Sequence, residues 1–452
     1  MDSAAPSNIC NCDANLVGFG VAQRFSAAIS GQSLEPALAA PRGSGLWVAQ
    51  RFSAAINGQS LEPALAAAVA AWKGETFQRY LRAEPRNHGI PWKSGASAPR
   101  WDRKLIGALA PVETRIHTYN LCFLGFGNVN RTLVELLRNR ESELRARHGI
   151  SYRITGIASR RLGWLANPEG LDAHVAQPPS AAISQKSAQT PSTIPAWLAV
   201  AQADVLFEAT SLNVQTGQPA IDHIRAALTH GAHAITANKG PIVHAYRELR
   251  DLAAAQGKLF LFESTVMDGV PIFSFFDQLP AIHLRGFHGI LNSTTNVILT
   301  EMENGRTFDE ALKKAQSLGI AETDATHDID GWDAAVKTAA LITVLMDVPI
   351  KLEDINREGI RNLTAEAVQA AKKAGRPYKL ICRAKKTEKG IEPTVHPEQI
   401  PLTDPMSQIT GTSSYIYFET DIFPGLALTE ENPGLYATAY GMLADFVRAV
   451  TK

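Results

Sequence analysis

The segment 330–337, Asp-Gly-Trp-Asp-Ala-Ala-Val-Lys, is where residue types and spacing best fit chemistry. On a helix, Asp330, Asp333 and Lys337 stand at i, i+3 and i+7 and share one face. A lysine held by a carboxylate one turn away is a positioned cation. Such a cation suits an oxygen that develops negative charge during a reaction and then needs a proton. Two structural alternatives remain: Asp330 as an N-cap with Asp333 closing a capping-box-like pair, or an ordinary surface pair of Asp333 and Lys337.

A glycine turn opens the second candidate site, a dinucleotide-binding turn between an apolar strand and a helix. Its residues are Gly125, Phe126, Gly127, Asn128 and Val129. The first glycine permits the tight turn, and the second lets the backbone approach a pyrophosphate at the helix N-terminus. Asn130 replaces the third glycine, so the motif is imperfect. The alternative is a plain glycine turn in an α/β domain that binds no nucleotide.

The end of the second expected strand indicates which nucleotide is bound. Ala158-Ser159-Arg160-Arg161 contains no acidic residue, although an acid at this place normally binds the ribose hydroxyls of NAD. A serine and two arginines suit a 2′-phosphate instead. Arg160 and Arg161 therefore favour NADP, with NAD still possible, and the alternative is a solvated basic loop.

The elements that must position these residues follow a strand–helix alternation. We expect a first strand within 119–127 that runs into the glycine turn, and further strands at 151–159, 203–210, 232–238 and 258–264. Helical segments are expected between them at 128–147, 219–231 and 243–257. This rhythm predicts an α/β fold with a Rossmann-type doubly wound, parallel sheet over 118–262. The Ala-, Ser- and Pro-rich segment 162–200 is interpreted as an inserted loop.

The rest of the chain predicts an α+β domain for catalysis and dimerisation over 263–433. It begins with a strand at 281–291, followed by helices near 293–303, 307–318 and 331–346, and by short strands within 378–420. A C-terminal helix within 434–452 is expected to return to the nucleotide-binding domain.

The first 117 residues differ from the rest of the chain because they contain a near-identical internal repeat. The sequence 21–40 recurs at 48–67 with one change, and a decayed copy stands at 175–184. The irregular spacing argues against a solenoid. We interpret the copies as duplicated or inserted sequence without a functional role, and we expect residues 1–117 to be a disordered or loosely helical extension and linker.

Taken in chain order, several strings resemble homoserine dehydrogenases from about residue 119 to about 450. They are Thr236–Pro241, the segment 263–271, Gly289–Asn296, Glu322–Asp324 and Asp328–Lys337. The resemblance implies an NAD(P)-dependent enzyme that interconverts L-aspartate 4-semialdehyde and L-homoserine in threonine, methionine and isoleucine biosynthesis. No C-terminal regulatory domain of the ACT type is expected after the last helix.

The resemblance also implies residue roles. Lys337, Asp333 and Lys239 would be catalytic, with Lys239 and Thr210 also on the cofactor side. Glu322 would hold the substrate ammonium, and the other substrate contacts would be Thr294 and Asp328. A loop would bind a monovalent cation such as Na⁺, mostly through backbone oxygens, at Glu263, Val266, Asp268 and Val270. A bare structural loop is the alternative reading of that segment.

Some positions depart from the family pattern. Asn130 and Ser293 stand where glycine is usual, and the turn 431–434 has fewer glycines than expected. These changes are expected to crowd the backbone near the cofactor or substrate. They leave two alternatives open: a relative that reduces another small amino or oxo acid, and a non-catalytic oligomeric binding protein with a decayed cofactor site.

Composition excludes several other classes. The 452 residues carry 44 basic and 44 acidic side chains, so no global field attracts nucleic acid or an anionic membrane. No apolar run is long enough for a membrane span. Four scattered cysteines and no evident export signal favour the cytoplasm. The expected partners are a small-molecule substrate and a second copy of the chain.

Overall fold

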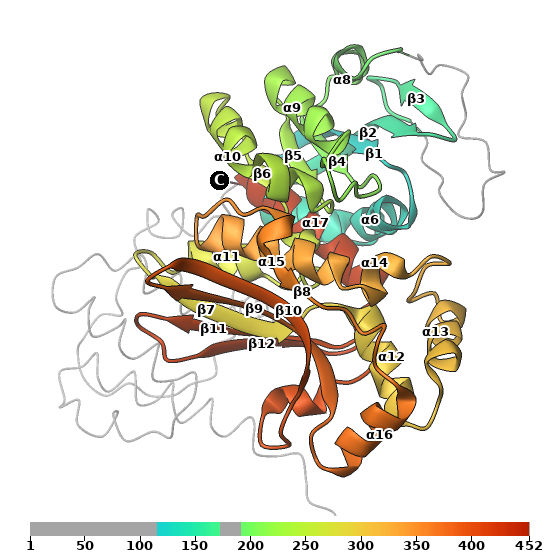
Figure 1. The fold of residues 1–452 in the computed structure, drawn as a ribbon. Helices are drawn as coiled ribbons and strands as arrows, with labels where there is room; N and C mark the ends of the chain where they lie inside the picture. The colour runs from blue at the N-terminus through green and yellow to red at the C-terminus, as the bar shows by residue number, and fades with distance from the viewer. Residues whose placement is uncertain (1–114, 172–190, 452) are drawn as a thin grey trace, which may run out of the picture. The chain divides into compact units, whose positions relative to one another are not determined.

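The computed structural model describes residues 115–171 and 191–451 (Figure 1). They build two halves, each on a six-stranded sheet. The expected N-terminal extension and the decayed repeat at 175–184 lie outside these residues, apart from Arg115, Ile116 and His117.

The first sheet has the strand order β3-β2-β1-β4-β5-β6. All neighbours run parallel except β2 and β3, so the prediction of a doubly wound α/β fold is confirmed. The strands are β1 His117–Leu124, β2 Ile150–Ser159, β3 Gly163–Ala166, β4 Val205–Glu208, β5 His233–Thr236 and β6 Phe260–Leu261.

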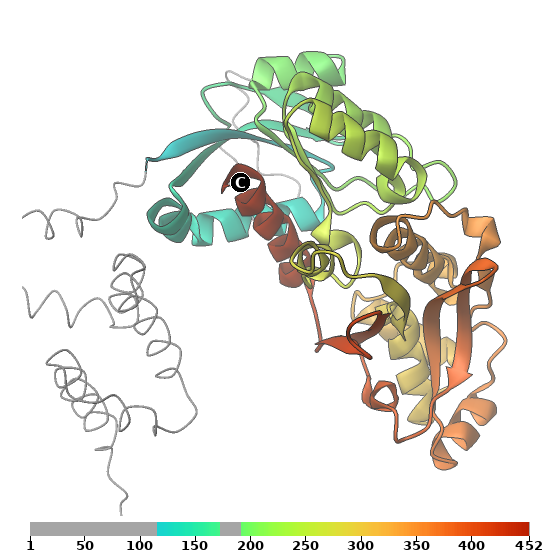
Figure 2. The same cartoon turned by 90° about the vertical axis from the view of Figure 1, so that its left-hand side faces the viewer.

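Helices cover both faces of this sheet, as Figure 2 shows. Side chains of β1 alternate between two hydrophobic clusters: Leu121 and Phe123 pack in one, Cys122 and Leu124 in the other. This alternation follows from the two-residue repeat of a strand. The helices are α6 Asn128–Asn139, α7 Glu141–His148, α8 Ile194–Ala201, α9 Ala220–His230, α10 Gly240–Ala255 and α17 Leu435–Thr451.

The last helix, α17, packs against α6 and contributes Met442 and Phe446 to the cluster that holds Phe123. Residues at the two ends of the described chain therefore share one core. The helical segment expected at 128–147 is divided at Arg140, which has φ −106° and ψ 5° and separates α6 from α7.

The interpretation of 162–200 as an inserted loop was wrong at both ends of that range. Residues 163–166 form β3, antiparallel to β2, and residues 194–201 form α8. Trp164 and Trp197 pack edge to face with ring centroids 5.4 Å apart, and the buried Trp197 donates its indole N–H to the Leu165 carbonyl. The packing of these two indoles, of which Trp197 is fully buried, stabilises segments whose Ala-, Ser- and Pro-rich composition favours a loop.

The second sheet has the order β12-β11-β7-β9-β10-β8. Its strands are β7 Leu284–Ile290, β8 Asn356–Arg357, β9 Tyr378–Thr387, β10 Gly390–Gln399, β11 Ser414–Thr420 and β12 Leu426–Glu430. The helices of this half are α11 Ile272–Asp277, α12 Ser293–Glu303, α13 Phe308–Ser317, α14 Thr326–Ile329, α15 Trp332–Leu345 and α16 Ala365–Lys373, with 3₁₀ turns η2 Glu263–Thr265, η3 Leu352–Asp354 and η4 Pro405–Gln408.

Helix α15 connects the halves because it packs on β9 and β10 and also contacts α10 of the nucleotide-binding half. Small residues allow this close packing: Ala334, Ala335, Ala339 and Ala340 are all buried. The expected strand at 258–264 is shorter in the structure. It ends at Leu261, and the 3₁₀ turn Glu263–Thr265 redirects the chain into the second half.

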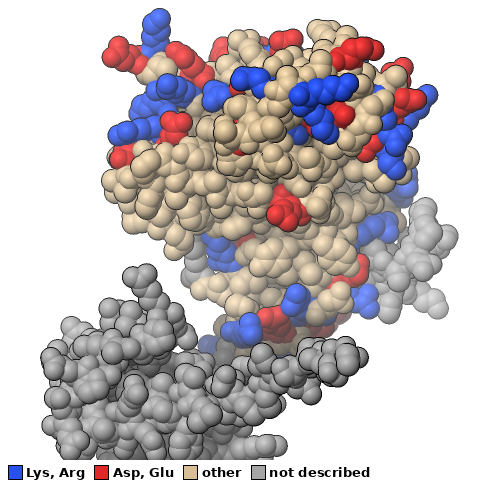
Figure 3. All heavy atoms as spheres, turned by 90° about the horizontal axis from the view of Figure 1, so that it is seen from below, with Lys and Arg blue, Asp and Glu red and all other residues tan. Residues whose placement is uncertain are grey.

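Charged side chains are mixed on the face shown in Figure 3, where lysine and arginine lie among aspartate and glutamate around a broad area with few charges. Among the described helices, none has the length and apolar character that crossing a membrane requires.

Candidate active site

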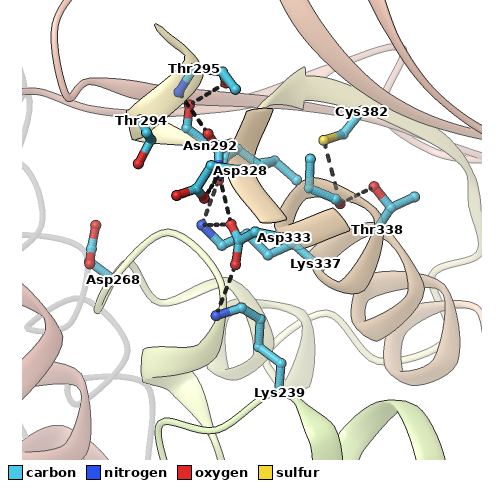
Figure 4. Close-up of polar contacts among 12 residues, drawn as sticks. Lys239, Asp268, Asn292, Thr294, Thr295, Asp328, Asp333, Lys337, Thr338 and Cys382 are labelled. Atoms are coloured by element: carbon cyan, nitrogen blue, oxygen red, sulfur yellow. Dashed lines mark hydrogen bonds and ion pairs between the residues drawn. The ribbon is translucent and has the colours of Figure 1, made fainter. Parts of the chain in front are cut away.

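Two lysines from different halves converge on one carboxylate, Asp333 (Figure 4). The Lys239 Nζ lies 3.3 Å from Asp333 Oδ1, and the Lys337 Nζ lies 3.2 Å from Asp333 Oδ2. Asp333 and Lys337 are one turn apart on α15, whereas Lys239 is the residue before α10, just beyond the carboxyl end of β5. Each of the three side chains is 20% exposed or less, so the group is shielded but open on one side.

The charges of this group stabilise one another. Burial alone raises the pKa of Asp333, but Lys337 and Lys239 outweigh it and hold that pKa well below its usual range. Burial likewise lowers the pKa of Lys337, and the attraction of Asp333, followed by that of Asp268, more than reverses this effect. Lys337 is therefore a fixed cation, and it also donates to the Leu291 carbonyl at 2.6 Å.

Asn292 joins a second carboxylate to the group. As the N-cap of α12 it accepts a hydrogen bond from the Thr295 N–H. Its Nδ2 donates to Asp328 Oδ1 at 2.7 Å and to Asp333 Oδ2 at 3.0 Å. Burial and the nearby Asp333 raise the pKa of Asp328. The sequence analysis did not predict a functional role for Asn292. Its position directly before an expected helix, where Asn is a favoured N-cap, was the signal that could have identified it.

Asp330 does not share the face of Asp333 and Lys337. Gly331, with φ +77°, is the residue before α15, and no side chain caps this helix. Asp330 instead accepts a hydrogen bond from Arg361 at 2.7 Å. The capping alternative for Asp330 is therefore wrong, and only Asp333 and Lys337 keep the geometry that the spacing predicted.

The other two substrate residues that the resemblance implied are Thr294 and Glu322. The Thr294 side chain lies beside Asp328 and opposes the rise in the pKa of that carboxyl (Figure 4). Thr294 is buried at the start of α12, and its hydroxyl donates to the Ile320 carbonyl at 3.3 Å. Glu322 lies exposed in the segment between α13 and α14. Within the described residues its carboxylate has no hydrogen bond or ion pair, and only its backbone carbonyl is bound, by Gln316.

The glycine turn has the form that a nucleotide phosphate requires. Gly125 has φ +80°, and a Cβ there would meet the Ala209 carbonyl oxygen at 2.4 Å, so only glycine fits. A Cβ at Gly127 would meet nothing within 4 Å. No side chain caps α6 and no acid occupies its first turn. Its first N–H groups thus remain available to an anion.

Asn130 does not crowd the turn. Its side chain is fully buried, and its Nδ2 donates to the carbonyls of Leu124 and Gly125, each at 3.2 Å. The amide braces the turn from the side of the core. The expected disturbance at this position was therefore wrong, because the side chain packs beneath the turn.

The end of β2 lies next to this turn, since Gly125 donates its N–H to the Ala158 carbonyl at 2.9 Å. Arg160 and Arg161 follow, both exposed, and neither forms a hydrogen bond or ion pair with any other residue that the structure describes. Thr210 lies beyond the neighbouring end of β4 and donates both its N–H and its hydroxyl to Glu208.

The loop assigned to a cation runs from Glu263 to Val270 and has left-handed backbone at Met267 and Asp268, with φ 51° and 52°. The Glu263 carboxylate accepts the N–H groups of Phe273 and Ser274 at the start of α11. Asp268 accepts the Thr438 hydroxyl at 2.7 Å and lies beside the lysine group (Figure 4). No group of three or more metal-binding side chains occurs among the described residues.

Comparison with known proteins places this arrangement in a family. Residues 125–263 match the family model described as homoserine dehydrogenase, NAD binding domain, and residues 271–447 match the model described as homoserine dehydrogenase. The NAD(+)-dependent homoserine dehydrogenase of Pseudomonas canavaninivorans is 33% identical over 335 residues, which are 73% of this chain and 95% of that protein.

Solved structures of homoserine dehydrogenases also align with this chain. A homoserine dehydrogenase from Thiobacillus denitrificans aligns with TM-score 0.64 and 29% identity over 74% of each chain. A hyperthermophilic archaeal homoserine dehydrogenase mutant in complex with NADPH aligns with TM-score 0.60 and 25% identity over 74% of this chain and 98% of that one. With a nucleotide turn and two lysines facing one carboxylate between the halves, the chain belongs to the homoserine dehydrogenase family.

Proposed function

We propose that the chain reduces L-aspartate 4-semialdehyde to L-homoserine with NADPH as the preferred hydride donor. The observation that carries this proposal is the convergence of Lys239 and Lys337 on Asp333. The group lies beyond the carboxyl end of β5, where open α/β sheets bind ligands. Two ammonium groups held by one shielded carboxylate are positioned to stabilise an oxygen that gains negative charge.

The residues of this chain bind the aldehyde and manage its proton. A bound nicotinamide supplies the hydride. Lys337, kept protonated by Asp333, stabilises the oxygen of the aldehyde as it becomes an alkoxide. Lys239 faces the same carboxylate from the nucleotide-binding half. It is the second candidate to bind the substrate or to donate a proton to the alkoxide oxygen. Asp328 and Asn292 fix the orientation of Asp333.

The glycine turn fits the nucleotide pyrophosphate, because the position of Gly127 is open and the first turn of α6 carries no competing acid. Asn128 and Val129 would offer backbone N–H groups, and Phe126 lies within the turn. Thr210 and Lys239 follow the adjacent strands β4 and β5, on the same side of the sheet.

The preference for NADP over NAD rests on Arg160 and Arg161. Both are exposed and without partners among the described residues, beside a strand end that carries no acid for the ribose hydroxyls. Guanidinium groups bind phosphate with charge-assisted hydrogen bonds. The Pseudomonas canavaninivorans relative is named NAD(+)-dependent, and comparing kcat/KM for NADPH and NADH tests the preference in this chain.

A monovalent cation such as Na⁺ is proposed at the loop of Glu263, Val266, Asp268 and Val270, through backbone oxygens. The Glu263 carboxylate already accepts two N–H groups, so this residue would contribute its carbonyl. Activity measured in sodium buffer and in a buffer with only large organic cations tests this site.

A homodimer in the cytoplasm is also proposed. The dimer rests on the family resemblance, and the cytoplasm rests on the four scattered cysteines of the sequence. Light scattering coupled to size-exclusion chromatography tests the oligomeric state.

The decisive experiment follows NADPH oxidation with aspartate semialdehyde, beside NADH and beside aldehydes that lack the amino group. We expect turnover with the semialdehyde and a higher kcat/KM with NADPH. Turnover that is better with another small oxo acid would reject the proposed substrate. Absence of both turnover and NADPH binding would reject enzymatic function altogether.

A further inference from the structure

The proposed chemistry leaves one buried acid unexplained. Glu208, the last residue of β4, is 0% exposed, and no lysine or arginine in residues 115–171 or 191–451 pairs with it. Burial raises the pKa of its carboxyl, and hydrogen bonds from Thr210 and Thr236 oppose that effect. An acidic group buried without a cation is costly, so the groups that bind it indicate its role.

Three donors from two residues, one in the loop after β4 and one at the end of β5, bind the Glu208 carboxylate. Oε1 accepts the N–H of Thr210 at 2.8 Å and also its hydroxyl, and Oε2 accepts the hydroxyl of Thr236 at 2.6 Å. Thr210 belongs to the loop after β4, and Thr236 ends β5, where it is the register partner of Glu208. A carboxylate suits this position because both of its oxygens accept and neither donates.

The hydroxyl of Thr236 links Glu208 to the loop that follows β5. Because its proton points to Glu208, its lone pair accepts the Asn238 N–H at 2.9 Å. The Asn238 side chain then binds both loops: Nδ2 donates to the Thr210 carbonyl at 3.1 Å, and Oδ1 accepts the Gly240 N–H at 2.9 Å. Thr236 and Asn238 are buried, so water does not compete with these bonds.

Lys239 stands between the two residues joined by that last bond. The backbone on either side of it is therefore fixed by hydrogen bonds that lead back to Glu208. The side chain of Lys239 must extend from this fixed point to reach Asp333 at 3.3 Å. Small displacements of a reacting group cost large factors in rate.

We propose that Glu208 is a positioning residue for the reaction, which fixes Lys239 through Thr236 and Asn238 and fixes Thr210 on the cofactor side through the same carboxylate. It touches neither the aldehyde nor the hydride. The inference rests on the proposed reduction, since Lys239 matters only if that reaction occurs.

The test compares Thr236→Val with Thr236→Ser. Valine keeps the shape but removes both the donor to Glu208 and the acceptor for Asn238, whereas serine keeps both. We expect Thr236→Val to lower kcat by roughly 10- to 100-fold, the scale for a misplaced reacting group. The dissociation constant for NADPH should change far less. Thr236→Ser should retain kcat within about threefold, because its hydroxyl preserves the chain of hydrogen bonds.

A double mutant separates positioning from general damage. If Thr236 acts through Lys239, adding Thr236→Val to Lys239→Met should leave kcat of the single Lys239→Met variant unchanged within about twofold. Losses that multiply would overturn the proposal. Equal kcat in wild type and Thr236→Val would also overturn it, whereas an inactive wild type would reject the proposed reaction itself.

Glu208→Gln provides a second route if Thr236→Val fails to fold. Glutamine keeps the size but has a single accepting oxygen in place of two. We expect a fall in kcat similar to that of Thr236→Val, again absent in the Lys239→Met background. A Glu208→Gln enzyme with wild-type kcat would contradict the role of the carboxylate.

Discussion

The ammonium group of Lys239, in the nucleotide-binding half, lies 3.3 Å from the carboxylate of Asp333, in the catalytic half. This pair joins the two halves where cofactor and substrate are expected to meet. Lys337 approaches the other oxygen of the same carboxylate at 3.2 Å. Because one anion holds two cations, removing Asp333 leaves two ammonium groups without their shared partner in a shielded place, whereas removing either lysine leaves a single ion pair.

The first prediction concerns this group. Lys337→Ala should lower kcat by roughly a hundredfold or more, because a preorganised charge partner of the developing alkoxide is lost. Asp333→Asn should be nearly as damaging, since it releases both lysines. Cofactor binding should barely change in either variant. Arg361→Ala, which breaks only the exposed pair with Asp330, is the matched control and should stay near wild type. Near-normal turnover of Lys337→Ala would remove this lysine from the mechanism.

Glu322 can be tested through the substrate ammonium. If it binds that group, Glu322→Gln should raise KM for homoserine more than KM for an analogue lacking the amino group. Asp324→Asn changes a nearby exposed acid of the same segment and serves as the control. Equal effects on both substrates would reject the role implied for Glu322.

Cofactor preference should depend on the end of β2. Arg160→Ala combined with Arg161→Ala is expected to weaken NADPH binding by about 1.5–3 kcal/mol, the scale of a charge-assisted hydrogen bond to phosphate. NADH binding should change little. Arg153→Ala, an exposed arginine within β2, controls for general loss of positive charge. An unchanged ratio of NADPH to NADH affinity would show that the phosphate is bound elsewhere.

Asp445 on α17 predicts a pH dependence of stability. Burial foremost, together with Glu263 and Asp277 and despite Arg448, raises the pKa of Asp445 to about 8. The unfolded chain releases this proton near pH 4. Between these values the folded state binds more protons, so the free energy of unfolding should fall as pH rises, on the order of a few kcal/mol in total.

Asp445→Asn keeps the oxygen that accepts the Glu263 N–H and removes the titration. Denaturant unfolding at several pH values should therefore show a flatter profile for Asp445→Asn than for wild type across this window. Parallel profiles would show that Asp445 does not titrate as the structure indicates.

The last prediction concerns the repeats. Deleting residues 1–115 should leave a folded and active enzyme, because β1 begins at His117 and every proposed site residue follows it. Circular dichroism and the NADPH assay on the shortened chain check this. Insolubility or loss of activity would mean that the N-terminal sequence contributes to folding or catalysis, contrary to our interpretation of it as inserted sequence.

The sequence alone determined the local chemistry. The spacing of Asp333 and Lys337 predicted a pair one helical turn apart, because helix geometry is a property of the chain itself. The alternation of strands and helices predicted the doubly wound sheet for the same reason. The prediction of an inserted loop at 162–200 was based on composition and failed at both ends of that range. There the contact between Trp164 and Trp197 stabilises regular structure among residues whose types favour a loop.

Only the tertiary structure decided which distant residues meet. Lys239 is 94 residues before Asp333 (333 − 239), and no local pattern relates the two positions. Their contact exists because α15 packs against α10 across the two halves. Burial decided the rest. The buried Asn130 amide donates to the glycine turn, and the buried Glu208 carboxylate accepts from Thr210 and from Thr236, because polar groups inside a protein are stabilised by hydrogen bonds.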